Sequence, residues 1–222
     1  MNGQPNRRDF VGRLAATSAA AIIGEEAFTA MVMPHVRTSA EPWDMSWVEK
    51  LKSPPYKAVI DANTFEEGYA LDLASGLYSA YKEAHGVGDD QVRIVIVARR
   101  GGTPLVFGDA LWEKYPIGTE TKMMESNNVP YRRNPYYRPR SGDSSGSGSS
   151  IESLTKRGVI FLVCNVAANN WARSLAEKTQ RDREEVKHEV FANLAPGTIV
   201  MPSGVFALMR AQNAGCAYMR GQ

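Results

Sequence analysis

Short apolar runs alternate with longer amphipathic stretches along most of this chain. Runs of strand length, rich in β-branched residues, cover residues 56–62, 91–98, 158–164 and 197–201, and a shorter one covers residues 216–219. Residues 65–85 repeat apolar side chains at the spacing of a helix, and further helices are predicted over residues 105–115, 151–157, 184–194 and 203–214 and directly after Cys164. Alternating strands and helices predict an α/β three-layer sandwich with a mainly parallel, five-stranded, flavodoxin-like sheet.

Polar residues follow the predicted strands where the chain turns into the next helix. The carboxyl ends of parallel strands meet at one edge of a sheet, so we expect these residues to line a common rim where a ligand binds. The candidates for ligand binding are Asn63, Thr64, Arg99, Arg100, Gly101, Gly102, Thr103, Asn165 and Ser203.

The turn after the second strand has the features of a small-anion site. Thr103 is predicted to cap a helix that Pro104 begins, which leaves backbone N–H groups unpaired beside Arg99 and Arg100. Sulfate, thiosulfate or phosphate suits such a helix start, and plain capping with surface charge is the alternative. Neither G-x-G-x-x-G nor the P-loop pattern occurs, which disfavours the familiar kinds of nucleotide binding.

Cys164 ends the most apolar strand and is the candidate catalytic residue. Nearby arginine and a helix N-terminus favour the thiolate form of a cysteine, which is its nucleophilic form. The alternative is that Cys164 packs as a small apolar side chain, which is the role we predict for Cys216. A disulfide between the two is not expected, because Cys164 ends its strand whereas Cys216 begins one.

Composition narrows the classes of function further. The 222 residues carry a net charge of +2, and the basic residues are scattered, which argues against a nucleic-acid-binding face. The two cysteines and three histidines show no metal-ligand spacing, so neither a metal nor a cofactor is predicted. The length suits one domain over residues 41–222.

Residues 1–40 resemble a twin-arginine export signal and leader. Arg7 and Arg8 precede Phe10 and Arg13, and an alanine-rich apolar stretch over residues 14–23 follows. That stretch is shorter than the roughly 20 residues that a permanent membrane span needs. We therefore predict a periplasmic or otherwise exported protein; a basic amphipathic N-terminus is the alternative.

Residues 131–150 interrupt the alternation of strands and helices. Arginine and tyrosine dominate residues 131–140, and serine and glycine dominate residues 141–150. This composition predicts a disordered loop. Its basic and aromatic residues suit stacking on single-stranded nucleic acid, but we favour a solvated or partner-facing insertion.

Several segments of the chain resemble the DsrE/DsrF-like family of small α/β sulfur-relay proteins. They are residues 57–62 with the helix that follows, Arg99-Arg100-Gly101-Gly102-Thr103-Pro104 through residues 109–115, residues 161–168 around Cys164, and residues 194–197 through 202–205 to 211–212. The resemblance implies that Cys164 takes up sulfane sulfur as a persulfide. It also implies a homo- or hetero-oligomer with a sulfur donor or acceptor protein as partner.

Two hypotheses of function follow from these observations. The first is an exported sulfur carrier with Cys164 as the acceptor and Arg99, Arg100 and the Thr103 helix start as the holder of an anionic sulfur species. The second is a non-catalytic oligomeric binding module for a small anionic ligand or a protein partner, in which Cys164 only packs. A hydrolase would need a general base near Cys164, and none lies close to it in the sequence.

Overall fold

The structure, a computed structural model, describes residues 43–138 and 149–221. These residues belong to a compact unit that spans Glu41–Gln222. The predicted leader lies outside the described residues, and so does the Ser/Gly-rich segment 139–148.

Five parallel strands form a single sheet. They are β1 (Tyr56–Ala62), β2 (Val92–Ala98), β3 (Ile160–Cys164), β4 (Ile199–Met201) and β5 (Ala217–Arg220), in the order β4-β3-β2-β1-β5. The central strands are buried along most of their length on both faces, which explains their nearly continuous runs of apolar residues. The predicted α/β class with a five-stranded parallel sheet is confirmed.

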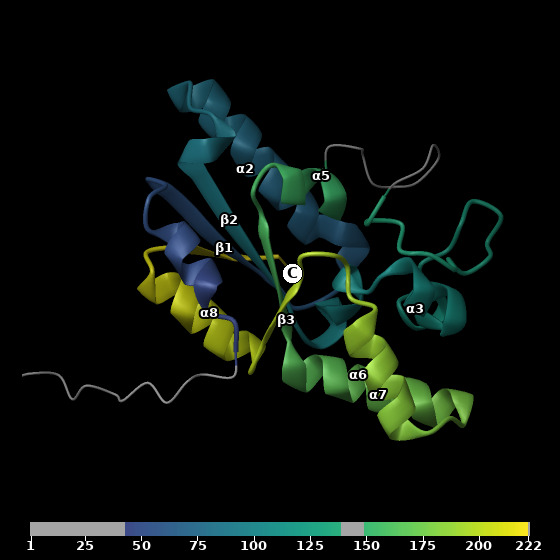
Figure 1. The fold of residues 1–222 in the computed structure, drawn as a ribbon. Helices are drawn as coiled ribbons and strands as arrows, with labels where there is room; N and C mark the ends of the chain where they lie inside the picture. The colour runs from purple at the N-terminus through teal and green to yellow at the C-terminus, as the bar shows by residue number, and fades with distance from the viewer. Residues whose placement is uncertain (1–42, 139–148, 222) are drawn as a thin grey trace, which may run out of the picture. The chain divides into compact units, whose positions relative to one another are not determined.

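Helices cover both faces of this sheet (Figure 1). One face carries α2 (Tyr69–His85), α3 (Asp109–Lys114), α4 (Ile117–Glu120), α5 (Ile151–Lys156), α6 (Asn165–Thr179) and α7 (Arg183–Ala192). The other face carries the 3₁₀ helix η2 (Ser46–Leu51) and α8 (Gly204–Asn213). The chain adds β1 to β4 in one direction and then returns to pair β5 with β1, so a right-handed connection places α8 on the opposite face.

The turn after β2 differs from the prediction of one helix over residues 105–115. A 3₁₀ helix, η5 (Arg100–Val106), comes first, and α3 begins only at Asp109. Thr103 and Pro104 therefore lie inside η5, and the prediction that they start an α-helix is wrong. The tighter turn brings Gly102 against the end of β1, where a Cβ atom would lie 2.1 Å from the Ala62 carbonyl oxygen.

The predicted disordered loop is packed over its first eight residues. Tyr131 and Tyr136 are buried, and so is Asn134, whose amide donates to the Leu105 and Phe107 carbonyl oxygens at 2.7 and 2.8 Å. The prediction of disorder is wrong for residues 131–138, because these side chains join the core and satisfy main-chain carbonyls around η5. No helix in the described part of the chain has the length and apolar character needed to cross a membrane.

Candidate functional site

Three side chains meet at the carboxyl ends of neighbouring strands. Ala62 pairs with Ala98, and Ala98 pairs with Val163, so the next residues along β2 and β3, Arg99 and Cys164, lie side by side. Side chains alternate between the two faces of a sheet, so Arg99 and Cys164 share the α8 face with Asp61 of β1. Local sequence thus places a carboxylate, a guanidinium and a thiol at one edge.

Arg99 is held in place by a buried carboxylate. Its Nε and Nη2 atoms donate to the two Asp61 oxygens at 2.7 Å each, and the Tyr218 hydroxyl donates to Asp61 Oδ2 at 2.9 Å. These hydrogen bonds from Arg99 to Asp61 raise the pKa of Arg99, and the nearby Cys164 adds a smaller increase. Gly204 leaves room for the Arg99 side chain, because a Cβ atom at residue 204 would lie 2.7 Å from Arg99 Cδ. Arg99 is therefore a fixed cation whose charge is largely balanced.

Cys164 lies at the start of α6 and is a free thiol. Its Sγ atom accepts a hydrogen bond from the Ala167 N–H at 3.4 Å and so caps the helix. The residue is only 7% exposed. The positive end of the helix dipole therefore points toward the sulfur atom.

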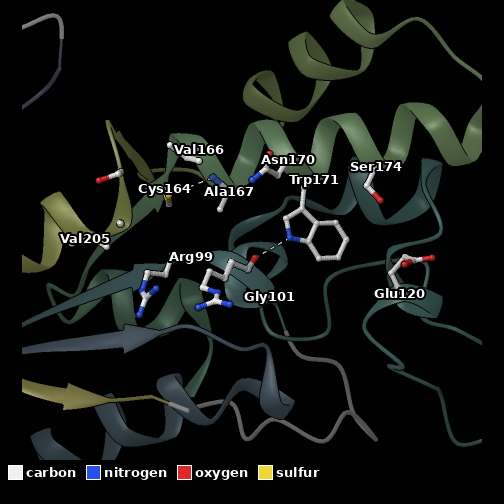
Figure 2. Close-up of a pocket in the computed structure, with 13 residues that line it drawn as sticks. Arg99, Gly101, Glu120, Cys164, Val166, Ala167, Asn170, Trp171, Ser174 and Val205 are labelled. Atoms are coloured by element: carbon white, nitrogen blue, oxygen red, sulfur yellow. Dashed lines mark hydrogen bonds between the residues drawn. The ribbon is translucent and has the colours of Figure 1, made fainter.

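A cavity of about 690 Å³ opens beside Cys164. Figure 2 shows Cys164 and Val205 at one end of it, Trp171 in the middle, and Ser174 and Glu120 at the other end. The α6 and α8 helices supply most of its wall, and the turn after β2, Cys164 of β3 and Glu120 of α4 supply the rest. The lining residues are Arg99, Arg100, Gly101, Glu120, Cys164, Val166, Ala167, Asn170, Trp171, Ser174, Ser203, Gly204 and Val205.

Arg100 has an unusual main-chain conformation and an exposed side chain. Its φ angle is 51°, and its carbonyl oxygen accepts hydrogen bonds from Trp171 Nε1 at 3.0 Å and from the Thr103 hydroxyl at 2.9 Å. These two bonds hold the turn against α6. Within residues 43–138 and 149–221, no carboxylate forms an ion pair with the exposed Arg100 guanidinium. Arg100 is thus the cation of this cavity whose charge is available to a ligand.

The structure brings together five of the ten predicted site residues. Arg99, Arg100, Gly101, Cys164 and Ser203 line the cavity, and the Ser203 hydroxyl accepts the Phe206 N–H at 3.1 Å as the cap of α8. The other five, Asn63, Thr64, Gly102, Thr103 and Asn165, do not line it.

These five residues either form hydrogen bonds within the protein or have buried side-chain atoms that do not line the cavity. The Gly102 N–H donates to the Asn63 and Arg99 carbonyls, and Thr103 is fully buried, so the expected cluster of unpaired N–H groups at Thr103 does not form. Asn165 accepts the Asn169 amide at 2.9 Å on the helix surface. Asn63 and Thr64 stand at the end of β1, with side-chain oxygen atoms that are buried. The α-helix start at Thr103 on which the predicted anion site depended is therefore not formed, whereas Arg99, Arg100 and Gly101 line the cavity.

Sequence reasoning missed the part of the site that α6 contributes. Val166, Ala167, Asn170, Trp171 and Ser174 recur at intervals of three and four residues, which places them on one face of a helix. That spacing follows from the helix that the sequence predicts directly after Cys164. Asp61 was also missed, although a single carboxylate inside an apolar strand indicates a buried charged partner.

The arrangement suits the binding of an anion next to a thiol. The available Arg100 and the N-terminal ends of α6 and α8 give positive potential near Cys164, whereas Asp61 largely balances the charge of Arg99. Among the residues that the structure describes, no group of three or more histidine, cysteine or acidic side chains is placed to hold a metal ion.

Comparison with known proteins identifies no function. No protein-family model matches this chain, and no curated protein matches it. A solved structure described as the protein of unknown function MTH1491, from Methanobacterium thermoautotrophicum, is similar to it at 22% sequence identity. That similarity covers 74% of this chain and 98% of the other, with a TM-score of 0.39.

Proposed function

We propose that this protein is a sulfur carrier that takes up sulfane sulfur on Cys164 as a persulfide. The observation that carries the proposal is the position of the Cys164 thiol at the N-terminus of α6, on the wall of a cavity that Arg99 and Arg100 also line. A persulfide is an anion near neutral pH, so positive potential at this position stabilises the loaded state.

The transfer step needs no cofactor. The Cys164 thiolate attacks the outer sulfur atom of a donor persulfide or polysulfide, and a new S–S bond forms while the S–S bond of the donor breaks. The donor leaves as a thiolate with the electron pair of the broken bond. The sulfur atom stays on Cys164 and leaves by the same reaction with an acceptor thiol.

A binding module for a small anionic ligand is the second candidate. The low exposure of Cys164 and its hydrogen bond to the Ala167 N–H favour this candidate, because both describe a thiol with a structural role. In that function, Arg100 and the Ser203 end of α8 hold the ligand and Cys164 forms only part of the wall.

Mass spectrometry after incubation with polysulfide separates the two functions. We expect the wild type and Cys216→Ser to gain one or more sulfur atoms and Cys164→Ser to gain none. A folded wild-type protein that gains no sulfur on Cys164 would reject the carrier function and leave the binding module.

We also propose export through the twin-arginine route, based on Arg7, Arg8 and the apolar stretch that follows. Fractionation of cells that express the full chain tests it. We expect the protein in the exported fraction, and Arg7→Lys with Arg8→Lys should keep it inside the cell. Equal distribution of the two forms would contradict export by this route.

A further inference from the structure

The cavity is far larger than an inorganic sulfur donor requires. Its volume of about 690 Å³ lies in the middle of the range of about 300–1,000 Å³ that is typical of small-molecule sites. Its α6 wall extends from Val166 to Ser174, which corresponds to about 12 Å at 1.5 Å per residue. Thiosulfate or a short polysulfide would fill only the end next to Cys164. Cavities of this size suit organic ligands.

Two exposed valines flank the cysteine end of the cavity from different helices. Val166 of α6 is 54% exposed and Val205 of α8 is 60% exposed. Trp171 continues the apolar surface along α6, and its indole ring is held by the hydrogen bond to the Arg100 carbonyl (Figure 2). A single exposed valine has no special meaning, but two beside one thiol and one aromatic ring form a surface for an apolar group.

Charge is distributed unevenly along the cavity. At the end away from Cys164, Glu120 pairs with Lys178, so these two charges neutralise each other. Near Cys164, the Arg99 charge is balanced by Asp61, whereas Arg100 carries a positive charge without a carboxylate partner among the described residues. A ligand that matches this wall has one anionic group and an adjoining apolar arm.

We infer that the sulfur donor at this site is an organic sulfane-sulfur anion with an aryl or short alkyl arm. This inference rests on the proposed function. The anionic end lies next to Cys164 within reach of Arg100, and the arm lies against Val166, Val205 and Trp171. An organic persulfide (RS–S⁻) and a thiosulfonate (RSO₂–S⁻) both have this form.

Transfer from a thiosulfonate is balanced without a further reactant. The Cys164 thiolate attacks the sulfane sulfur, and the bond between that sulfur and the sulfonyl sulfur breaks. The sulfinate, RSO₂⁻, leaves with the electron pair, and Cys164 keeps the transferred sulfur as a persulfide anion. The sulfonyl group is reduced to the sulfinate as the cysteine sulfur is oxidised.

Binding of unreactive sulfonates to the full chain tests the match between cavity and ligand by calorimetry. The probes are benzenesulfonate, methanesulfonate, which lacks the arm, and benzenesulfonamide, which lacks the charge at neutral pH. We expect benzenesulfonate to bind about tenfold more tightly than either, because only it contacts both the apolar wall and the cation. Equal affinity for benzenesulfonate and methanesulfonate would overturn the inference.

Paired variants locate the binding on the molecule. Val205→Ser should weaken benzenesulfonate binding about threefold, whereas Met209→Ser, a control for an exposed residue one turn further along α8, should not change it. Arg100→Gln should weaken benzenesulfonate and leave benzenesulfonamide unaffected, with Arg210→Gln as the control for loss of an exposed arginine. Binding that is insensitive to both Val205→Ser and Arg100→Gln would place the ligand elsewhere and contradict the inference.

A transfer assay separates this inference from the proposed function. Benzenethiosulfonate, methanethiosulfonate and thiosulfate are compared as donors to Cys164, each relative to its reaction with free glutathione, and the aryl donor should be preferred. Loading by polysulfide without any preference among these donors or among the sulfonates overturns the inference but leaves the carrier function. A binding preference without loading of Cys164 overturns the carrier function and the assignment of the bound anion as a sulfur donor.

Discussion

The two cysteines of this chain are almost equally covered, yet their surroundings differ. Cys164 is 7% exposed and Cys216 is 6% exposed. Cys164 is the last residue of β3 and lines a cavity, whereas Cys216 precedes β5 and packs among the apolar side chains under α8. Burial raises the pKa of Cys216 to about 11, and the nearby Lys57 only partly opposes this. Exposed area alone therefore does not distinguish a candidate reactive thiol from a core thiol; position on the sheet does.

The largest expected effect is on thiol modification. At pH 8, a pKa of about 11 leaves only about 0.1% of Cys216 as thiolate, so its reaction with iodoacetamide in the folded protein should be slow. We expect Cys164 to react at least about a hundredfold faster, because its sulfur borders an open cavity. Peptide mapping over time measures both sites. Equal rates, or faster labelling of Cys216, would remove the distinction between the two cysteines.

Removal of the Arg99 guanidinium should lower the free energy of unfolding strongly. Arg99→Gln leaves the buried Asp61 carboxylate without its ion-pair partner, and we expect a loss of about 3 kcal/mol in the free energy of unfolding. Urea denaturation measures this loss. Arg138→Gln, which breaks an exposed pair with Glu152, is the control and should leave stability almost unchanged. A similar small change in both variants would show that the Asp61 pair contributes little.

The stability of the protein at alkaline pH should show whether folding holds the Cys216 thiol in its neutral form. The pKa of this thiol rises from 9.0 to about 11 on folding, so its contribution to stability is complete below pH 9 and is lost as the pH rises toward 11. Cys216→Ala removes this contribution. Between pH 8 and pH 11, the free energy of unfolding of the variant should improve relative to wild type by about 2 kcal/mol. Curves that stay parallel over this range would contradict a thiol held in its neutral form.

Two glycines give the smallest expected effects. Gly204→Ala places a Cβ atom 2.8 Å from Arg99 Cβ, which cannot swing away, and should cost about 1 to 2 kcal/mol. Gly76→Ala, within α2, meets no atom within 4 Å and should stabilise the protein by about 0.8 kcal/mol. Thermal unfolding of both variants tests how closely the start of α8 packs against Arg99. Stabilisation by Gly204→Ala would show that the packing at Arg99 is looser than described.

The sequence pattern predicted the sheet better than the loops. The five strands were predicted because strands buried on both faces require nearly continuous apolar residues, and β1 and β3 in particular follow their apolar runs closely. The turn after β2 was mispredicted because Thr103 and Pro104 have the composition of a helix start, while the close contact of Gly102 with β1 imposes a 3₁₀ turn. Tyr131 and Asn134 were mispredicted because their partners lie far away in the sequence.

The site was predictable only where strand ends define it. Cys164 ends a strand and Arg99 and Ser203 follow strands; the sequence predicts all three, because parallel strands bring their carboxyl ends to one edge of the sheet. Val205 and Glu120 could not be found in the same way. Their place in the cavity depends on how α8 and α4 pack against other elements, and local sequence does not encode that packing.

The pairing of β5 with β1 has a consequence for biosynthesis. The hydroxyl of Tyr218 reaches Asp61 across a separation of 157 residues, and Ala217 pairs with Ala58. During synthesis, β1 to β4 therefore emerge from the ribosome before the strand that pairs with the outer edge of β1, and until then one Asp61 hydrogen bond is unmade. The sheet can therefore be completed only after β5 has been synthesised, and long-range pairings of this kind slow folding.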